Sequence, residues 1–212
     1  MRPVQRTLGS TAAVTTSLAS SASPGAGVAF TQQATTFSSG YAQLVTLTST
    51  TGTTNAGTTY TITGTDADGH LQTEATITGP AGSATVTSTK YFLTVTSIVG
   101  VGASTSIAAG NSALSGSATF ISDYINPVAS MGYGFTTSGA GATFKLQHTY
   151  DNVFDATQAG SSAKTWFDDA TVTAKTGAFN YSMTNAVRGS RIVLTAWTSG
   201  TVTGTLVQGM QT

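Results

Sequence analysis

The stretch from residue 60 to residue 77, YTITGTDADGHLQTEATI, decides how the first half of this 212-residue chain is expected to fold. On both sides of its centre, apolar and polar residues alternate, which is the two-residue period of a half-buried β-strand. Between the two runs stands Asp68-Gly69, a strong signal for a two-residue hairpin turn. Glycine adopts positive φ without penalty and aspartate tolerates it. The stretch therefore predicts an antiparallel hairpin, with Asp68 and Gly69 as structural turn residues.

The same stretch gathers three carboxylates and an imidazole, which raises the alternative of a cation or catalytic site. An EF-hand loop needs oxygen ligands at positions 1, 3, 5 and 12 and glycine at position 6. Counted from Asp66, glycine falls at position 4 and no acid stands at position 12. Two histidines and no cysteine also exclude a histidine or thiolate metal cluster within one chain. We therefore expect no metal and no cofactor, and an incidental surface cation stays open as the alternative.

Composition extends the β prediction to the whole chain. Charged residues make up 8% of the sequence and hydrophobic residues 39%, whereas charged residues are about 25% of an ordinary domain. Threonine and valine favour strands, and the 24 glycines supply turns. Eight basic and eight acidic side chains cancel, so the chain has no electrostatic footprint for nucleic acid or for an anionic membrane. No apolar run reaches the roughly 18 residues of a transmembrane helix.

Short strand patterns, with turn residues at intervals of about ten, indicate β-sandwiches or small barrels. We predict an all-β protein with two small antiparallel units, sandwich- or jelly-roll-like, at residues 40–116 and 117–212. In the second unit, 191–197 and 201–207 alternate around Thr198-Ser199-Gly200, which predicts another hairpin. The apolar faces of its clearest strands are expected to form its core: Phe144, Leu146, Tyr150, Ile192, Leu194 and Leu206.

Residues 1–39 are expected to form an extended N-terminal arm ahead of both units. They are rich in Ser, Thr, Ala and Gly, and neither a helical period nor a long apolar run passes through them. An arm of about 30 residues can reach up to ~100 Å, far enough to lie across a neighbouring subunit. Its spaced apolar residues are the predicted interface anchors: Val14, Leu18, Val28 and Phe30. The alternative that stays open is a disordered tail, or an arm that folds back on its own β units.

The sequence offers no specific catalytic pattern. A triad with His148 and Asp151 can be written, but no G-x-S-x-G elbow accompanies it. His148 stands on the apolar face of a predicted strand, where a hydrogen-bonded core histidine is expected. Asp168 and Asp169 are adjacent, so on a strand they point to opposite faces and cannot act as a pair. No P-loop and no dinucleotide fingerprint is present. We expect no catalytic residue and no enzyme.

Several segments resemble a family of small β-rich virion structural proteins of tailed bacteriophages. In the second block these are DYINP at 123–127, FKLQHTYDNVFD at 144–155, Trp166-Phe167 and AVRGSRIVLTAWTSGTVTGTLVQG at 186–209. The opening MRPVQ, the hairpin stretch at 62–80 and STKYFLTVTSI at 88–98 are similar to further parts of such proteins. The matching segments cover about half of the chain and are fold-forming residues without a catalytic signature.

The resemblance implies a place in the virion, after assembly in the host cytoplasm. The leading hypothesis is a capsid decoration or cement protein that stabilises the head shell through subunit contacts. Its partners would be the major capsid protein or neighbouring virion proteins, and the protein would form a homo-oligomer, a dimer or a trimer. Two alternatives stay open: a low-copy neck, tail or head-fibre component, and a carbohydrate-binding module of a tail that uses Trp166, Trp197 and Asp168.

Overall fold

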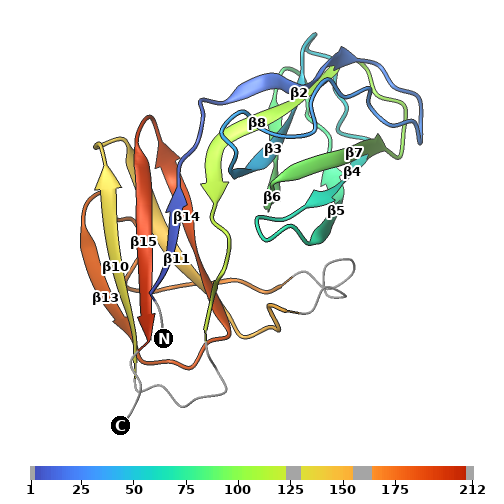
Figure 1. The fold of residues 1–212 in the computed structure, drawn as a ribbon. Helices are drawn as coiled ribbons and strands as arrows, with labels where there is room; N and C mark the ends of the chain where they lie inside the picture. The colour runs from blue at the N-terminus through green and yellow to red at the C-terminus, as the bar shows by residue number, and fades with distance from the viewer. Residues whose placement is uncertain (1–2, 123–129, 155–163, 209–212) are drawn as a thin grey trace. The chain divides into compact units, whose positions relative to one another are not determined.

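The computed structural model describes residues 3–122, 130–154 and 164–208, and in these ranges the chain is built from antiparallel β-strands (Figure 1). The all-β prediction is therefore confirmed. Within the same ranges no helix is long and apolar enough to cross a membrane. The strands are β1 (Val4–Leu8), β2 (Val14–Ala22), β3 (Ala42–Ser49), β4 (Thr59–Thr65), β5 (Leu71–Thr78), β6 (Thr85–Phe92), β7 (Thr94–Gly100), β8 (Ile107–Gly116), β9 (Phe120–Ile121), β10 (Met131–Ser138), β11 (Ala142–Thr149), β12 (Phe167–Asp168), β13 (Phe179–Met183), β14 (Gly189–Trp197) and β15 (Thr201–Gln208).

The chain divides into two compact units. The predicted boundary at 116/117 lies three residues from the observed one at Ala113/Leu114, whereas the predicted boundary at 39/40 has no counterpart. Unit 1 combines the residues up to Ser10 with those from Leu114 onwards, whereas unit 2 consists of Thr11–Ala113. Unit 2 is thus inserted into the sequence of unit 1, directly after β1. Local patterns could not reveal this insertion, because β1 acquires its place only by pairing with the last strand of the chain.

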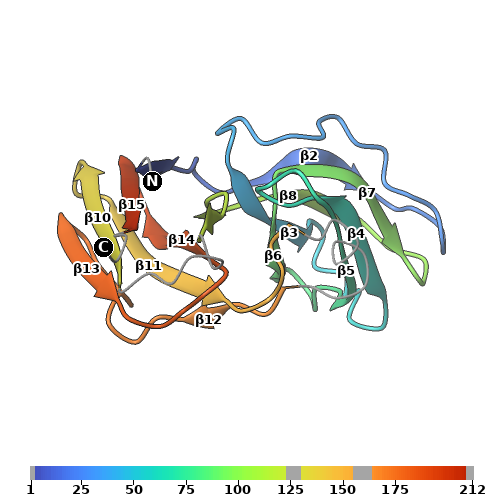
Figure 2. The same ribbon diagram turned by 60° about the horizontal axis from the view of Figure 1, so that its bottom comes forward.

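Unit 1 is a sandwich of two antiparallel layers (Figure 2). One layer has the order β1-β15-β10-β13, and in the other β14 lies between β11 and the end of β8, with β12 on the far side of β11. The short β9 also pairs with β14. The rings of Phe135 on β10 and Phe144 on β11 lie 5.1 Å apart between their centroids, which brings the two layers into contact.

The predicted hairpin at 191–207 is wrong, since β14 and β15 belong to different layers. β14 pairs with β11 and β15 pairs with β10, so the turn at 198–200 carries the chain across the sandwich. The β10–β11 turn makes the same crossing beside it: Ser138 and Thr201 share a hydroxyl hydrogen bond of 2.8 Å, and Thr198 N donates to Gly141 O at 2.8 Å. A turn that joins strands of two different layers needs the same alternation and the same glycine as a hairpin within one sheet. The sequence pattern therefore could not distinguish the two.

The predicted core of the second block is confirmed for five of its six residues. Phe144, Leu146, Ile192, Leu194 and Leu206 are buried. Tyr150 is instead 50% exposed, because β11 ends at Thr149 and the alternation does not continue beyond the strand.

Unit 2 contains a sheet in which β8, β3 and β6 are neighbours and β2 pairs with β8, together with a three-stranded sheet of order β5-β4-β7. Its core draws side chains from every part of the unit. The members are Leu18, Ala19, Phe30, Phe37, Val45, Leu47, Tyr60, Ile62, Phe92, Val95, Ile98, Ile107 and Ala109. Four of these residues precede position 40, so the first part of the chain is needed to complete this core.

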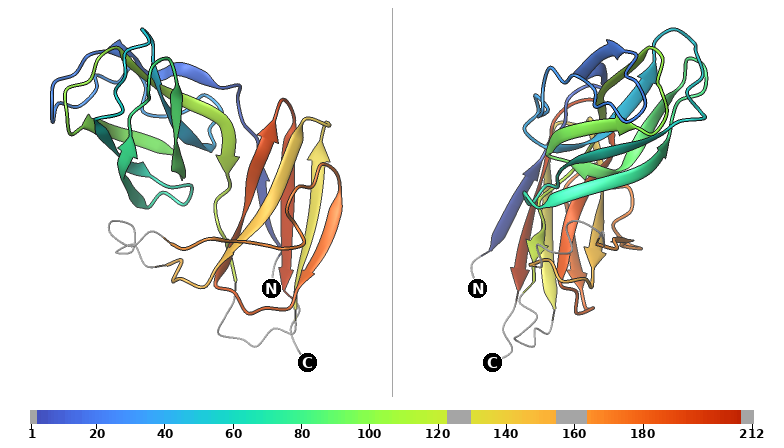
Figure 3. Two further views of the ribbon diagram at one scale, coloured as in Figure 1. Left: turned by 180° about the vertical axis from the view of Figure 1, so that it is seen from behind. Right: turned by 90° about the vertical axis from the view of Figure 1, so that its right-hand side faces the viewer.

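The prediction of an independent N-terminal arm is therefore wrong. β1 is an edge strand of unit 1, where it runs beside β15 (Figure 3), and β2 pairs with β8 in unit 2. Beyond β2, Phe30 N donates to Ile98 O at 2.9 Å, and Gln33 N donates to Leu18 O at 2.8 Å. The segment showed no period because isolated apolar side chains, such as Phe30, each fill one place in a core built by other strands.

The hairpin at 60–77 is present, with a turn that differs in detail from the expectation. β4 and β5 pair antiparallel up to Thr65↔Leu71. Gly69 N donates to Asp66 O at 3.1 Å and Asp66 N donates to His70 O at 2.8 Å, while Gly69 has φ +83°. Asp68 is not among the residues of positive φ. The connection is therefore a three-residue loop with one left-handed position, taken by glycine, instead of a two-residue turn with two such positions.

We expect Gly69→Val to destabilise unit 2 by about 1 kcal/mol or more, because a β-branched residue is penalised at positive φ. A Cβ at this position meets no atom within 4 Å, so strain of the backbone is the whole effect. Urea denaturation would measure the change, and Gly69→Asn should show a smaller one, since asparagine tolerates the left-handed region. Equal stability of the valine variant and the native protein would contradict this account of the turn.

Candidate functional site

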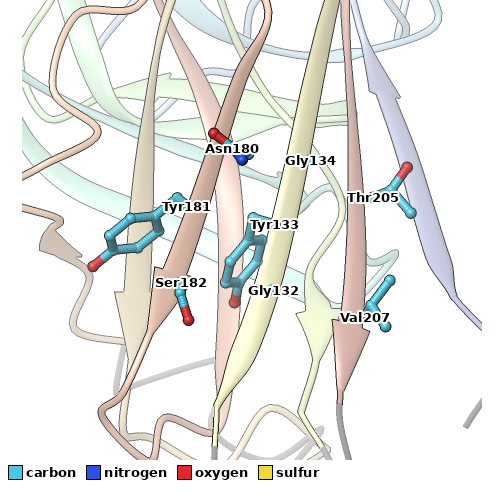
Figure 4. Close-up of a pocket in the computed structure, with 8 residues that line it drawn as sticks. All are labelled: Gly132, Tyr133, Gly134, Asn180, Tyr181, Ser182, Thr205 and Val207. Atoms are coloured by element: carbon cyan, nitrogen blue, oxygen red, sulfur yellow. The ribbon is translucent and has the colours of Figure 1, made fainter.

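A groove runs over β10 on the outer face of the four-stranded layer of unit 1 (Figure 4). It consists of two adjoining hollows of about 450 Å³ each. The residues that line them are Gln5, Gly132, Tyr133, Gly134, Phe135, Thr136, Ala178, Phe179, Asn180, Tyr181, Ser182, Thr205 and Val207. The groove thus draws on all four strands of the layer and on the residue before β13.

The strand register explains how the groove forms. Gly134 is aligned with Asn180 on β13 and with Thr205 on β15, and Gln5 on β1 continues the same row. In the next row, Gly132 stands between Ser182 and Val207. Because aligned residues of neighbouring strands share a face, two glycines form the floor and longer side chains rise on both sides.

Beneath this floor the layer is fixed by two tyrosines, Tyr133, which is buried, and Tyr181, which is half-buried. Tyr133 and Tyr181 are aligned on β10 and β13, and their rings stack with centroids 6.3 Å apart. The hydroxyl of Tyr133 forms a 2.8 Å hydrogen bond with Ser190, and Tyr181 donates to Asp169 Oδ2 at 2.8 Å. Asp169 is itself buried and accepts the N–H groups of Thr171 and Val172. The groove therefore lies on a rigid support.

The environment of both tyrosines favours the neutral phenol. Burial raises the pKa of Tyr133 to about 12, against the opposing effect of the Ser190 hydrogen bond. Desolvation also raises the pKa of Tyr181 to about 12, with the hydrogen bond to Asp169 and the charge of that carboxylate acting in the same direction.

These shifts predict a loss of stability in alkali. The folded state holds the Tyr133 proton more tightly than the unfolded chain, whose tyrosine pKa is about 10. This stabilisation is fully present below about pH 10, where it amounts to at most about 2.7 kcal/mol of folding free energy. It is lost as the pH rises from about 10 towards 12. Tyr133→Phe should be less stable than the native protein at about pH 9, and the gap should narrow by about pH 11.5. Urea denaturation of both proteins across this pH range would measure the difference in their unfolding free energies. A difference that does not change with pH would contradict the prediction.

A second surface feature of unit 1 is an exposed aromatic cluster of His148, Tyr150 and Phe167. The Phe167 ring lies 5.9 Å from each of the other two rings, and His148 lies 5.6 Å from Tyr150. Tyr150 and Phe167 are 50% and 46% exposed. The cluster continues the apolar face of β11 beyond the covered core.

The opposite face of the same strands is polar. Asp168 accepts hydrogen bonds from Lys145 Nζ at 2.9 Å and from Gln147 Nε2 at 2.7 Å. Arg191 donates to Gln147 at 2.9 Å, and its guanidinium lies 4.2 Å from the Trp166 ring. Desolvation opposes ionisation of Asp168, but these hydrogen bonds and the charges of Lys145 and Arg191 lower the pKa of its carboxyl group. The group is thus a paired surface acid.

The residues weighed for catalysis are not brought together. Among the described residues, His148 makes ring contacts only, and its buried Nδ1 has no hydrogen-bond partner. The prediction of a hydrogen-bonded core histidine is therefore wrong. Asp151 instead accepts a hydrogen bond from Thr165 N. Asp168 and Asp169 point to opposite sides, as expected, the first to the surface and the second into the interior.

The tryptophans do not form the exposed platform that the carbohydrate alternative required of them. Trp166 is half-buried beside Arg191. Trp197 is half-buried as well, and its Nε1 donates to Gly200 O at 2.9 Å, which makes it part of the interlayer turn.

In the β4–β5 loop, ligand atoms of Asp66, Asp68 and His70 lie within 4.8 Å of one another. Asp66 Oδ1 already accepts the N–H groups of Asp68 and His70, both at 2.9 Å, and His70 Nδ1 is 3.8 Å from Asp66 Oδ2. These contacts explain Asp66 as a loop-forming residue, while the surface cation stays an open alternative.

Glu74, the third carboxylate of this stretch, belongs to the interior. It is buried, and it accepts hydrogen bonds from Thr89 N and Thr89 Oγ1 on one oxygen and from Lys90 N on the other, at 2.8–2.9 Å. Glu74 thereby ties β5 to β6, which belong to different sheets of unit 2. The alternating pattern located the residue on a strand but gave no sign of this bond.

We expect Glu74→Gln to destabilise unit 2 by about 1–3 kcal/mol, because an amide NH₂ would replace one acceptor and leave a buried N–H group without a partner. Asp66→Asn, which keeps its acceptor oxygen, should change stability by less than about 0.5 kcal/mol. Thermal unfolding with and without a chelator would measure both. If chelation or Asp66→Asn lowered the melting temperature strongly, the loop would have to be reassigned as a cation site.

The four predicted interface anchors divide into two groups. Leu18 and Phe30 are buried in the core of unit 2, so their assignment as anchors for a neighbouring subunit is wrong. Val14 and Val28 are 45% and 54% exposed, and for them the prediction stays untested. The segment DYINP at 123–127 lies outside the described residues.

Sequence reasoning missed the groove. Its one signal was that Met131, Tyr133 and Phe135 alternate with small residues. Comparison with known proteins adds no assignment, since no protein-family model, curated protein or solved structure matches the chain.

Proposed function

We propose that this protein is a structural component of a bacteriophage virion, and that it acts as a decoration or cement protein on the head shell. Its partner would be the major capsid protein or a neighbouring virion protein, and it would bind as a dimer or trimer. The exposed aromatic cluster of His148, Tyr150 and Phe167 is the observation that carries the proposal. Aromatic residues are enriched in protein interfaces, where they supply large apolar area.

The low charge of the chain supports the same conclusion. With 8% charged residues and no net charge, little repulsion opposes the approach of a second protein surface. Within the cluster, Tyr150 and Phe167 are 50% and 46% exposed. Exposed apolar groups that lie close together mark surfaces that bind proteins.

The double variant Tyr150→Ser, Phe167→Ser tests the proposal. It should keep the fold, because both rings are about half exposed, and it should lose binding to empty head shells in a co-sedimentation assay. Val101→Ser is the matched control, since Val101 is an exposed apolar residue of unit 2 outside the cluster. Undiminished binding by the double variant would reject the cluster as the docking surface.

Copy number separates the head shell from the neck or tail. Mass spectrometry of purified particles should find the protein in amounts comparable with the major capsid protein. A few copies per particle would favour the alternative of a neck, tail or head-fibre component, and its absence from particles would reject the virion assignment.

A further inference from the structure

Neither packing nor backbone conformation within unit 1 requires glycine at the two floor positions of the groove. A Cβ on Gly134 would meet nothing within 4 Å, and one on Gly132 would make only an ordinary contact, at 3.7 Å, with Val207 O. Neither residue has positive φ. By contrast, strand glycines such as Gly64, Gly110 and Gly204 are packed so closely that a Cβ would lie under 3.0 Å from another atom. Glycine inside a strand costs stability and often marks a place where a ligand approaches the backbone.

The walls of the groove present polar groups that nothing in the described chain uses. The side chains of Gln5, Thr136, Asn180, Ser182 and Thr205 line the hollows, and each is exposed or half-exposed. Within the described residues these side chains make no hydrogen bond or ion pair. They offer amide and hydroxyl groups, each of which can both donate and accept hydrogen bonds.

Charge and backbone pairing restrict the occupant. None of the residues that line the groove carries a charge, so ionic ligands find no partner there. β10 is paired on both sides, by β13 and by β15. An extended peptide therefore cannot add to the sheet by main-chain hydrogen bonds, which is how such peptides gain affinity on an open edge.

We propose that this groove binds a neutral, hydroxyl-rich oligosaccharide. Sugar hydroxyls both donate and accept, which matches the amides and hydroxyls of the walls, and one face of a sugar ring can lie on a floor that has no side chains. Three successive outward positions of β10 (132, 134 and 136) span about 13 Å, enough for a short oligosaccharide. The hollows are also within the size range of small-molecule sites, ~300–1,000 Å³.

Tyr133 and Tyr181 give the site its preorganisation. Their hydroxyls are held by Ser190 and Asp169, so the strands that carry Gly132, Gly134 and Asn180 are fixed before a ligand arrives. A preformed site loses less conformational entropy on binding. The proposal does not rest on a role in the virion, because it depends only on the groove.

The test is a titration with neutral probes, maltoheptaose, cellohexaose and mannohexaose, followed by calorimetry and by amide chemical shifts. At least one probe should bind at millimolar concentration or below and shift the amides of β10, β13 and β15. An anionic probe, hexagalacturonate, should bind more weakly. Failure of all neutral probes to bind overturns the proposal.

Gly134→Val is the decisive variant, because it fills the floor without a clash and should keep or raise the melting temperature. It should weaken binding of the neutral probe by about tenfold or more, and Asn180→Ala should weaken it several-fold. Gly57→Val is the matched control: its Cβ also meets no atom within 4 Å, but it lies in unit 2. Equal affinity of Gly134→Val and Gly57→Val overturns the proposal. Head-shell binding by Gly134→Val, measured in parallel, should be unchanged, which keeps this outcome distinct from the virion assignment.

Discussion

A chain that begins at Gly40 should lose the fold of unit 2. It lacks β2 together with the buried side chains of Leu18, Phe30 and Phe37, which belong to the core of that unit. Each such side chain contributes about 1.5–3 kcal/mol when fully buried, and the net stability of a domain is only about 5–15 kcal/mol. Without these side chains, Tyr60 and Ile98 would also be exposed to water. Amide hydrogen exchange should show loss of protection throughout β3, β4 and β7.

A chain that begins at Thr11 serves as the control. It lacks β1, which is an edge strand of unit 1, and it keeps every segment of unit 2. Unit 1 should become less stable while the amides of unit 2 keep their protection. If instead the chain that begins at Gly40 retained protected amides in β3, β4 and β7, the segment before Gly40 would be a true arm and the assigned core would be wrong.

Gly110→Val should destabilise unit 2 by about 3 kcal/mol or more. Gly110 lies on β8 directly beside β2, and an added Cβ would collide with the carbonyl oxygen of Val14 and with the backbone of Thr15. These are backbone atoms, so β2 itself must move. Overpacking of this kind costs about 1–3 kcal/mol, and displacement of Leu18 from the core adds part of its burial energy.

Denaturation in urea, followed by a probe in unit 2, would measure the effect of Gly110→Val. Gly57→Val is again the suitable control, because its Cβ meets no atom, and it should change stability by less than about 0.5 kcal/mol. Equal stability of the two variants would mean that β2 does not lie against β8.

Local sequence predicted much of unit 2 and the place where it ends, but not the place where it begins. The alternation on both sides of Asp68-Gly69 correctly placed β4, β5 and the turn between them, because a hairpin is made of neighbours in the chain. The loop type was missed, since the choice between one and two left-handed residues depends on how the strands are aligned. The roles of Leu18 and Phe30 were missed because their partners are strands distant in sequence.

The candidate site shows the same division. The alternation of Met131, Tyr133 and Phe135 with small residues is the one local sign of the inward face of β10, where all three are buried. That the glycines between them form a groove depends on the walls, which come from β13 and β15, about 50 and 70 residues further along the chain. Glu74 is a similar case, because its bonds to Thr89 and Lys90 exist only once β5 and β6 lie together.

By itself the sequence determined the all-β class, the turn at Gly69 and the inward faces of β11, β14 and β15. Each of these follows from φ preferences or from two-residue alternation, which act between neighbouring residues. The tertiary structure alone decided that β14 and β15 enter different layers, that β1 closes unit 1 and that β2 completes unit 2. The backbone hydrogen bonds of a strand can be satisfied by any other strand. The partner is selected by the shape of the shared core and by the close approach that positions such as Gly110 allow. That selection is made by atoms that are far apart in the chain, so no local pattern records it.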